Sequence, residues 1–345
     1  MKDKVTYFIA SLGYWLGIDR LFYWLNRRCK RVLTFHNVFP DDLTLADGGG
    51  GMSMSESTLK SVVREIGKRY RFSVDFDDPE TATLTFDDGF LNQYEVAARA
   101  LADMGIPAVL FVAGDNIDRT QPMDAPAVDL LTLWLAHVPQ KILADFAASL
   151  PYGNGTSGNL HVSRMRFWID VLRPLYVGDS HARGRSIVAK CDQAYPFSTL
   201  VASLPAEYVR LRLGGVSSAQ LDDLRGRGWK IGWHSKSHYP LSAIPCSEKH
   251  QEFLAPDDIK FMPMSYPYGE LRSVDNDDVR ICRESGFPMA FSNLPEDNRM
   301  LGPFFRMRFT IPSDKVMLHF HLSGFRYFLK SGRLLPGHHE DSVLS

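Results

Sequence analysis

The sequence lacks three things: paired cysteines, an apolar run long enough to span a membrane, and an excess of charge of either sign. No two of its cysteines form a C-x-x-C pair, and they stand far apart at Cys29, Cys191, Cys246 and Cys282. Paired cysteines at short spacing are the usual sign of a disulfide framework or a thiolate zinc site, so we expect neither. A metal ion bound by this chain should therefore have histidine and carboxylate ligands.

The charge balance excludes one broad class of partner. Lys and Arg number 39 and Asp and Glu number 40, which gives a formal net charge of −1. Without a strongly basic field, sequence-independent attraction to nucleic acid is not expected. The 345 residues, 45% hydrophobic and 23% charged, indicate an ordinary folded protein. At roughly 150 residues per domain, this length allows two domains or one large α/β domain with insertions.

The longest apolar stretch lies near the start of the chain, from Val5 to Ile18. Asp19 and Arg20 interrupt it before the roughly 20 apolar residues that a spanning helix needs. A basic cluster at residues 27–31 follows instead of a small-residue cleavage site, which argues against a secretory signal. Neither a transmembrane helix nor an export signal is therefore predicted.

Residues 1–30 are predicted to form an amphipathic helical segment, because apolar side chains recur at helical spacing at Trp15, Ile18, Phe22 and Leu25. Two interpretations remain open. The segment packs on the core of the protein itself, or it contacts a membrane surface peripherally through residues 5–25. The expected location is the cytoplasm, and the second interpretation would place the protein at the surface of the inner membrane.

Short apolar or β-branched runs alternate with helical patterns along most of the chain. This alternation predicts parallel strands joined by crossover helices, hence an α/β sheet or barrel. The expected strands are 32–35, 83–86, 108–112, 230–233, 264–266 and 289–291, and the expected helices are 58–70, 94–104, 218–225 and 277–285. Ser53 and Glu56 have the spacing of a capping box and predict the start of the first helix.

Three segments fall outside this pattern. The interval 118–217 is too long for a structureless loop, and its helical patterns predict a helical insertion. The glycine run 48–51 is not followed by Gly-Lys-Ser/Thr, so we expect a flexible loop rather than a phosphate cradle. The short polar segment 331–345 is expected to be a flexible tail.

Two adjacent carboxylates end one of the apolar strands, in Thr85-Phe86-Asp87-Asp88-Gly89. Neighbouring residues at the end of a strand can point in different directions, so one carboxylate can bind a metal ion while the other stays free as a base. The same motif also fits a simple Asp-Gly turn with a helix cap.

Two histidines, His234 and His238, follow another strand. A spacing of four lets both imidazoles reach one ion, and two histidines with an aspartate suit Zn²⁺ and leave positions open for water and substrate. Two surface histidines would show this spacing by chance, but the carboxylates at another strand end favour a metal site. Co²⁺ and Ni²⁺ fit the same ligand set.

A third strand end carries Met264-Ser265-Tyr266-Pro267-Tyr268-Gly269. A backbone N–H in such a turn can stabilise an oxyanion as it develops. The segment also fits a turn with only a structural role.

Taken in this order, Thr85–Gly89, His234–His238 and Tyr266–Gly269 resemble the first three motifs of the polysaccharide deacetylases, the NodB-homology group of carbohydrate esterases. The runs Gly105-Ile106-Pro107-Ala108 and Leu241-Ser242 are similar to further segments of that family. The resemblance covers roughly residues 31–312 apart from the insertion. It implies one distorted (β/α) barrel over residues 31–330, with the site at the carboxyl ends of its strands.

The resemblance also implies a role for each matched residue. Asp87 matches the general base of the family. Three residues match its metal ligands: Asp88, His234 and His238. Tyr268 matches the residue whose backbone N–H assists the oxyanion.

The chain departs from the family pattern where many members have an arginine shortly before the proline of the third motif. Met264 and Ser265 occupy that neighbourhood here. Arg306 and Arg308 lie where many exopolysaccharide-type members have an arginine, and we expect Arg308 to orient the base.

A second departure concerns the general acid. The late Leu-x-His motif of the family is matched only loosely, at His319. Leu33-Thr34-Phe35-His36 looks like the early histidine segment of the exopolysaccharide deacetylases. His36 is therefore the expected acid and His319 the reserve, although His36 also fits a histidine buried in the core.

The activity that the resemblance implies is metal-dependent removal of an N-acetyl group from an amino sugar, with release of acetate. The expected substrate is an exopolysaccharide, capsule or O-antigen glycan, or a lipid-linked precursor. Two other functions remain open: hydrolysis of a C–N bond in a small non-sugar amide, and glycan binding by a degenerate site. The width of the cleft bears on this choice, because a sugar chain needs an open groove with aromatic walls.

Overall fold

The computed structural model describes residues 2–43, 52–150, 163–177, 181–270, 272–293 and 302–335. Its main sheet is parallel throughout and has the strand order β10-β9-β8-β7-β6-β5-β1-β11. These strands are β1 (Arg31–Phe35), β5 (Thr81–Asp88), β6 (Val109–Val112), β7 (Lys230–Trp233), β8 (Met264–Ser265), β9 (Ala290–Ser292), β10 (Arg306–Met307) and β11 (Phe309–Thr310). Three short strands lie outside this path: β4 (Arg71–Phe72) pairs with β5, and β2 (Asn37–Phe39) pairs with β3 (Ser53–Ser55).

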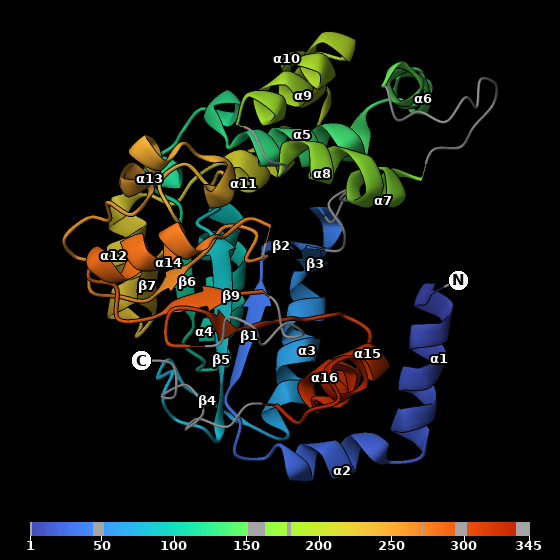
Figure 1. Cartoon of the computed structure of the whole chain (residues 1–345), viewed down its shortest axis with the longest axis vertical. Coiled ribbons are helices and arrows are strands. Elements are labelled where there is room, and N and C mark those ends of the chain that lie inside the picture. The colour runs from blue at the N-terminus through green and yellow to red at the C-terminus, as the bar shows by residue number, and fades with distance from the viewer. Residues whose placement is uncertain are drawn as a thin grey trace.

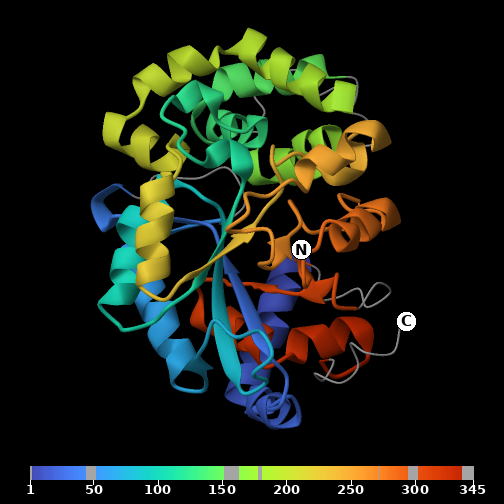
Figure 2. The same ribbon diagram turned by 90° about the vertical axis from the view of Figure 1, so that its left-hand side faces the viewer.

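The two ends of the sheet meet at one segment of chain. β10 pairs with β9 at one edge, β11 pairs with β1 at the other, and Arg308 alone separates β10 from β11. The sheet therefore curls until its edges nearly join, as Figures 1 and 2 show. The expectation of a distorted (β/α) barrel is confirmed.

Alternation along the strands divides the apolar side chains into two sets. Val32, Val109, Phe111 and Phe291 pack together as one cluster, whereas Leu33, Phe35, Leu84 and Phe86 belong to the large core shared with the helices. Successive side chains on a strand point to opposite faces, so the first set fills the barrel and the second faces the outer helices.

The outer helices lie between the strands in sequence. They are α3 (Glu56–Gly67), η2 (Gln93–Ala98), α4 (Arg99–Ala102), α12 (Ser218–Gly226), α13 (Cys246–Glu252), α14 (Asn276–Glu284), α15 (Lys315–Leu322) and α16 (Phe325–Ser331). Single 3₁₀ turns occur at η1 (Asp41–Leu43), η3 (Gly114–Asn116), η4 (Pro122–Asp124) and η6 (Leu241–Ala243).

The predicted cap of the first outer helix was wrong. The hydroxyl of Ser55, not that of Ser53, accepts the capping hydrogen bond from the Thr58 N–H. Ser53 lies in β3, where it pairs with Asn37. The pairing of β2 with β3 therefore moves the helix start two residues along the chain.

Between β6 and β7 the described chain is mainly helical. Its elements are α5 (Ala127–His137), α6 (Gln140–Ser149), α7 (Arg164–Phe167), η5 (Trp168–Leu172), α8 (Arg173–Tyr176), α9 (His181–Ala194), α10 (Phe197–Ser203) and α11 (Ala206–Leu213). Figures 1 and 2 show these helices grouped over the end of the barrel at which the strands finish. Trp134 and Leu172 belong to the same buried core as the outer face of the barrel.

The N-terminal segment forms two helices, α1 (Lys2–Trp15) and α2 (Ile18–Leu25). Gly17 separates them with a φ of +73°, so the expected single apolar stripe does not exist. Phe22 is buried and stacks on Phe325 with ring centroids 5.0 Å apart, whereas Trp15 is 81% exposed. Among the described helices, none is long and apolar enough to cross a membrane.

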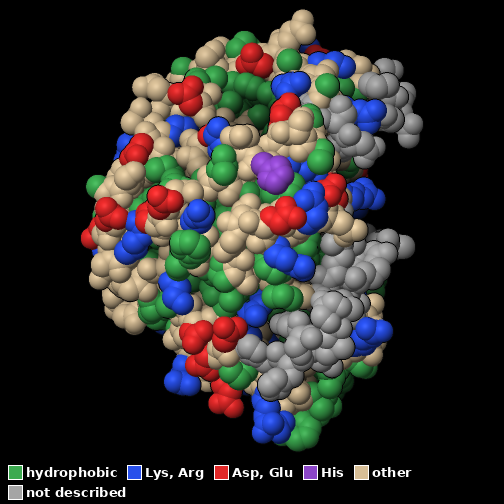
Figure 3. All heavy atoms as spheres, turned by 60° about the vertical axis from the view of Figure 1, so that its left-hand side comes forward, with side chains coloured by type: hydrophobic (Ala, Val, Ile, Leu, Met, Phe, Trp, Pro, Cys, Tyr) green, Lys and Arg blue, Asp and Glu red, His purple; other side chains and the backbone are tan. Residues whose placement is uncertain are grey.

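Two of the sequence predictions fall wholly or mostly on residues outside those the structure describes. These are the glycine run 48–51 and residues 336–345 of the predicted tail. Within the part of that predicted tail that the structure describes, Leu335 is buried and its N–H donates to the Asn26 side chain at 3.0 Å. On the face drawn in Figure 3, basic and acidic side chains are interspersed rather than gathered into large fields of one sign.

Candidate active site

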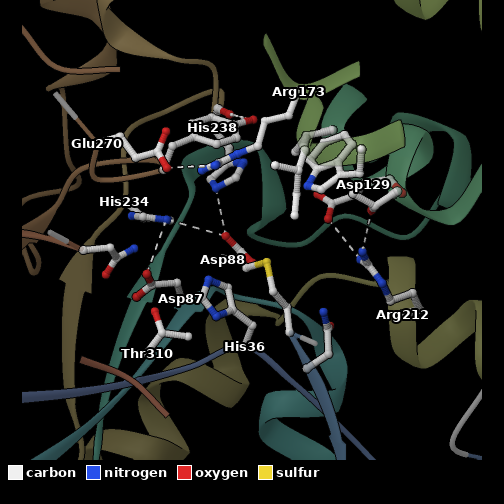
Figure 4. Close-up of a pocket in the computed structure, with 18 of the residues that line it drawn as sticks. His36, Asp87, Asp88, Asp129, Arg173, Arg212, His234, His238, Glu270 and Thr310 are labelled. Atoms are coloured by element: carbon white, nitrogen blue, oxygen red, sulfur yellow. Dashed lines mark hydrogen bonds and ion pairs between the residues drawn. The ribbon is translucent and has the colours of Figure 1, made fainter. Parts of the chain in front are cut away.

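The motifs singled out in the sequence meet in one pocket of about 350 Å³ at the carboxyl ends of the strands. Figure 4 shows His36, Asp87, Asp88, His234 and His238 around it. The barrel explains this convergence, because parallel strands end at the same rim.

The backbone is strained where it presents these side chains. The described non-glycine residues with a positive φ are Asp88, Asp118, Ser235, His238 and Tyr268. All but Asp118 belong to the strand-end motifs of the pocket. A left-handed conformation costs roughly 1–2 kcal/mol for an L-residue. The fold therefore accepts strain at the points where strands turn into the site.

Asp88, His234 and His238 are buried and offer three ligand atoms that lie within 4.8 Å of one another. The Nε2 atom of His238 lies 2.9 Å from Asp88 Oδ1, and that of His234 lies 3.5 Å from the same oxygen. The Nδ1 of His234 lies 2.7 Å from the Ser265 carbonyl, to which it can only donate. That bond leaves the lone pair of Nε2 directed at Asp88, the tautomer that a metal ligand needs.

The protonation of His234 and Asp88 fits a cation site. Burial lowers the pKa of His234 to about 4, so its imidazole is neutral at neutral pH. Burial alone would raise the pKa of Asp88, but the neighbouring His238 holds it well below its usual range. A neutral imidazole and an ionised carboxylate are the forms that bind a metal. Burial would lower the pKa of His238, but the Asp88 carboxylate outweighs it and raises that pKa, so a bound metal ion would displace the His238 proton. This group can hold a metal ion, and its donors suit a divalent transition metal.

Asp87 and Asp88 are adjacent but have different partners. Both oxygens of Asp87 accept hydrogen bonds from Arg308, at 2.7 Å from Nη1 and 2.6 Å from Nη2. Arg308 also donates to the hydroxyls of Thr85 and Ser265. Burial would raise the pKa of Asp87, but the Arg308 charge outweighs it and holds the pKa below its usual range. Asp87 is thus an ionised, oriented carboxylate beside the candidate metal centre.

His36 and Tyr268 also line the pocket on the barrel side. The His36 carbonyl accepts a hydrogen bond from the Gln93 side chain at 3.1 Å, which holds the turn after β1. The Tyr268 ring packs against His238 with centroids 5.3 Å apart.

The structure brings the other six predicted site residues together around Asp87 and places two alternatives elsewhere. The reserve acid His319 lies on α15, where it contacts the Tyr23 hydroxyl at 3.0 Å and Glu65 at 3.1 Å, and it does not line the pocket. Arg306, the other candidate arginine, pairs with Asp77 at 3.1 Å.

Sequence reasoning missed the part of the pocket that the insertion supplies. Asp129 and Thr132 on α5 and Arg212 on α11 are buried and line it. Arg212 donates to Asp129 Oδ1 and to the Thr132 hydroxyl, both at 3.0 Å. Arg173 of α8 pairs with Glu270 of the barrel at 2.7 Å, and both residues line the pocket.

One signal in the sequence could have revealed this wall. Asp129 and Thr132 interrupt the otherwise apolar run Ala127–Ala136 at a spacing of three, which places both on one helix face. A carboxylate buried in such a run needs a charged partner, and several arginines in the insertion could have supplied it.

No protein-family profile and no curated protein matches the sequence. Solved structures do match its fold. A polysaccharide deacetylase from Bacillus cereus is 12% identical with a TM-score of 0.47, covering 85% of this chain and 68% of the other. The deacetylase PplD of Streptococcus pyogenes, solved with acetate, is 11% identical with a TM-score of 0.43, covering 89% and 98%. IcaB from Ammonifex degensii is 14% identical with a TM-score of 0.45, covering 87% and 97%. The chain is thus structurally similar to polysaccharide deacetylases, at low sequence identity.

Proposed function

We propose that this protein is a metal-dependent hydrolase that removes an N-acetyl group from an amino sugar of a polysaccharide or glycan precursor. Water is consumed, the amide C–N bond breaks, and acetate and a free amine are released. One observation carries the proposal: an ionised Asp87, clamped by Arg308, lies beside the candidate metal group in the same pocket. A base beside a bound cation is the arrangement that metal-assisted amide hydrolysis uses.

Asp88, His234 and His238 would hold the ion, and Zn²⁺ suits them. A divalent ion held there would polarise the acetyl carbonyl and make a bound water more acidic. Asp87 would accept the proton of the attacking water, because its depressed pKa keeps it ionised and Arg308 fixes its direction.

The remaining steps fall to two further residues on the barrel side of the pocket. The backbone N–H of Tyr268 would donate to the oxygen on which negative charge develops, a contribution of roughly 3–4 kcal/mol for one good donor. His36 would donate a proton to the departing amine nitrogen, which otherwise leaves as a poor anion. Both residues line the pocket that holds Asp87.

The test is acetate release from a panel of N-acetylated saccharides with Zn²⁺, Co²⁺ or Ni²⁺ added. Asp87→Asn should lower kcat by about 10²–10⁴ while metal content stays that of the wild type. Asp88→Ala and His238→Ala should lose the metal, and Asp124→Asn, at an exposed aspartate, is the matched control. Unchanged metal content in both ligand variants would refute the ligand assignment. Absence of acetate release across the panel would refute the proposed activity.

We also propose that α1 and α2 contact an anionic membrane surface. Large apolar side chains are exposed along both helices, with Phe8 and Leu16 at 66%, Trp15 at 81% and Trp24 at 59%. The exposed charged residues between 4 and 30 are all basic: Lys4, Arg20, Arg27 and Arg28. Exposed apolar and basic side chains together suit the headgroup region of such a surface.

Vesicle flotation tests this contact. The wild type should float with vesicles rich in phosphatidylglycerol, and the double variant Phe8→Glu/Trp15→Glu should not. Phe261→Glu is the control, because Phe261 is 71% exposed but lies outside these helices. Two results would exclude a membrane as the partner of this face. One is flotation of the double variant equal to that of the wild type, and the other is a wild-type dimer that the double substitution dissociates.

A further inference from the structure

The insertion is fixed to the candidate active site at its neck. The Asn116 side chain donates to the carbonyl of Asp88 at 2.7 Å, and the Val216 N–H donates to the carbonyl of Gly89 at 3.0 Å. The Leu91 N–H donates to the carbonyl of Gly214 at 2.8 Å. Because both ends of the insertion bond to the end of β5, its helices form a built wall of the pocket rather than a loose appendage.

That wall carries a buried carboxylate with unused bonding capacity. Asp129 is 5% exposed and lines the pocket. Its Oδ1 is held by Arg212, but among the described residues its Oδ2 has no hydrogen-bond partner. A buried polar atom without a partner costs free energy that a bound ligand can restore. In Figure 4, Asp129 and Arg212 lie across the pocket from His234.

The same wall narrows the pocket. Trp168 and Thr132 line it beside Asp129, and the ion pair between Arg173 and Glu270 ties the insertion to the barrel along its lining. A volume of about 350 Å³ is at the small end of the roughly 300–1,000 Å³ range of ligand pockets. Among the residues that the structure describes, the lining leaves room for a single sugar unit or a disaccharide.

We propose that Asp129, positioned by Arg212, binds a hydroxyl group of the acetylated sugar, so that this protein acts on the terminal N-acetyl sugar of a saccharide and not on internal units. The proposal rests on the proposed deacetylase function. Asp129 and Arg212 neutralise each other, so the wall attracts a neutral hydroxyl rather than an ammonium group. A hydroxyl both donates and accepts, and it therefore bonds Asp129 in either protonation state.

The first experiment compares chitooligosaccharides of increasing length, with mass spectrometry to locate the unit that loses acetate. The wild type should deacetylate only an end unit, and Asp87→Asn should bind the disaccharide and the longest oligomer with Kd values within roughly threefold. Acetate loss from internal units would overturn the terminal-sugar proposal while leaving the deacetylase function standing. Binding of an end unit by a protein that never releases acetate would refute the function and leave the subsite. Neither binding nor release would refute both.

The second experiment tests the residue. Asp129→Ala should lower kcat/KM on the best oligosaccharide by about 10- to 100-fold, as expected for a lost hydrogen bond to a charged group, with metal content unchanged. Analogues in which the terminal sugar lacks one hydroxyl identify the group that Asp129 binds. For one of them, kcat/KM of the wild type should fall well below its value on the complete sugar, whereas kcat/KM of Asp129→Ala should be the same on both. Wild-type kcat/KM in Asp129→Ala, or equal sensitivity of both proteins to every analogue, would refute the role of Asp129.

Asp129→Ala leaves Arg212 buried without its partner, so a second variant guards against misfolding. Asp129→Ala/Arg212→Met removes both charges and should show the same loss of discrimination at higher stability.

Arg173→Gln should weaken the tie to Glu270 and admit longer chains, so that acetate is also lost from internal units. Arg183→Gln, at an exposed arginine of α9, is its matched control. Strict end-unit selectivity in Arg173→Gln would show that the ion pair does not limit chain length.

Discussion

The contact between Asp87 and Arg308 should be the most sensitive buried pair in the barrel. Both side chains are fully buried, and two hydrogen bonds of 2.7 and 2.6 Å join them. Two unit charges about 4 Å apart attract by roughly 4 kcal/mol at an effective dielectric constant of about 20. Arg308→Met removes that attraction and leaves a buried carboxylate uncompensated, so we expect a loss of about 3–5 kcal/mol in the free energy of unfolding.

Asp87→Asn leaves the opposite charge uncompensated and should also destabilise the protein. The double variant Asp87→Asn/Arg308→Met contains neither charge, so its loss should be smaller than the sum of the single losses. A coupling free energy of at least about 2 kcal/mol is expected between the two positions. Urea unfolding of the metal-free variants near pH 7, followed by tryptophan fluorescence, measures it.

Two results would refute this reasoning. One is a loss below about 1 kcal/mol in Arg308→Met, and the other is simple addition of the single losses in the double variant. The exposed Arg183→Met is the control for removal of an arginine. Arg308→Met should also lose turnover with its metal retained, because Arg308 touches the base and is not one of the candidate metal ligands.

Three further changes have defined outcomes. His319→Gln should cost about 1–3 kcal/mol, because the buried Tyr23 and the partly buried Glu65 each lose a hydrogen bond, and should leave kcat near the wild-type value; loss of turnover at unchanged stability would make His319 the acid. Burial lowers the pKa of His321 from 6.5 to about 3, so between these two pH values the unfolded state binds a proton that the folded state does not. Acidification from about pH 6.5 to 3 should therefore reduce the free energy of unfolding by up to roughly 1.4 kcal/mol per pH unit. His321→Gln should flatten this slope, measured as urea midpoints between about pH 7 and 4; an unchanged slope would exclude His321 as its source. Gly215→Ala should cost about 1–3 kcal/mol in thermal unfolding, because its Cβ would overlap the Asn116 carbonyl oxygen; wild-type stability would mean that the neck shifts freely.

Local sequence patterns were enough to group His234 and His238 with one of two adjacent aspartates, and the family resemblance then selected Asp88 as the ligand. Apolar runs mark the strands, and polar residues follow them at Asp88, His234 and His238. Because parallel strands of a barrel end at one rim, ligands from different strands meet without any knowledge of the loops. The structure accordingly places these three ligand atoms within 4.8 Å of one another.

Other features depended on contacts that no local pattern contains. The hydroxyl of Ser55 caps α3 because Ser53 is used in the pairing of β2 with β3. Asp129 and Arg212 meet across a sequence separation of 83 residues. Long-range pairings of this kind are set by how helices pack, which the periodicity of one helix does not specify.

Arg308 links the closure of the barrel to the orientation of Asp87, the proposed base. It is the one residue between β10 and β11, and its N–H donates to the Ser292 carbonyl at 3.0 Å while its side chain holds Asp87. Its guanidinium also donates to Ser265, the position where the sequence departs from the family pattern of an arginine before the proline. A cation supplied from the barrel seam can orient the base only when the two edges of the sheet are joined. Loosening the seam should therefore reduce turnover before it unfolds the outer helices, because Asp87 loses its partner first.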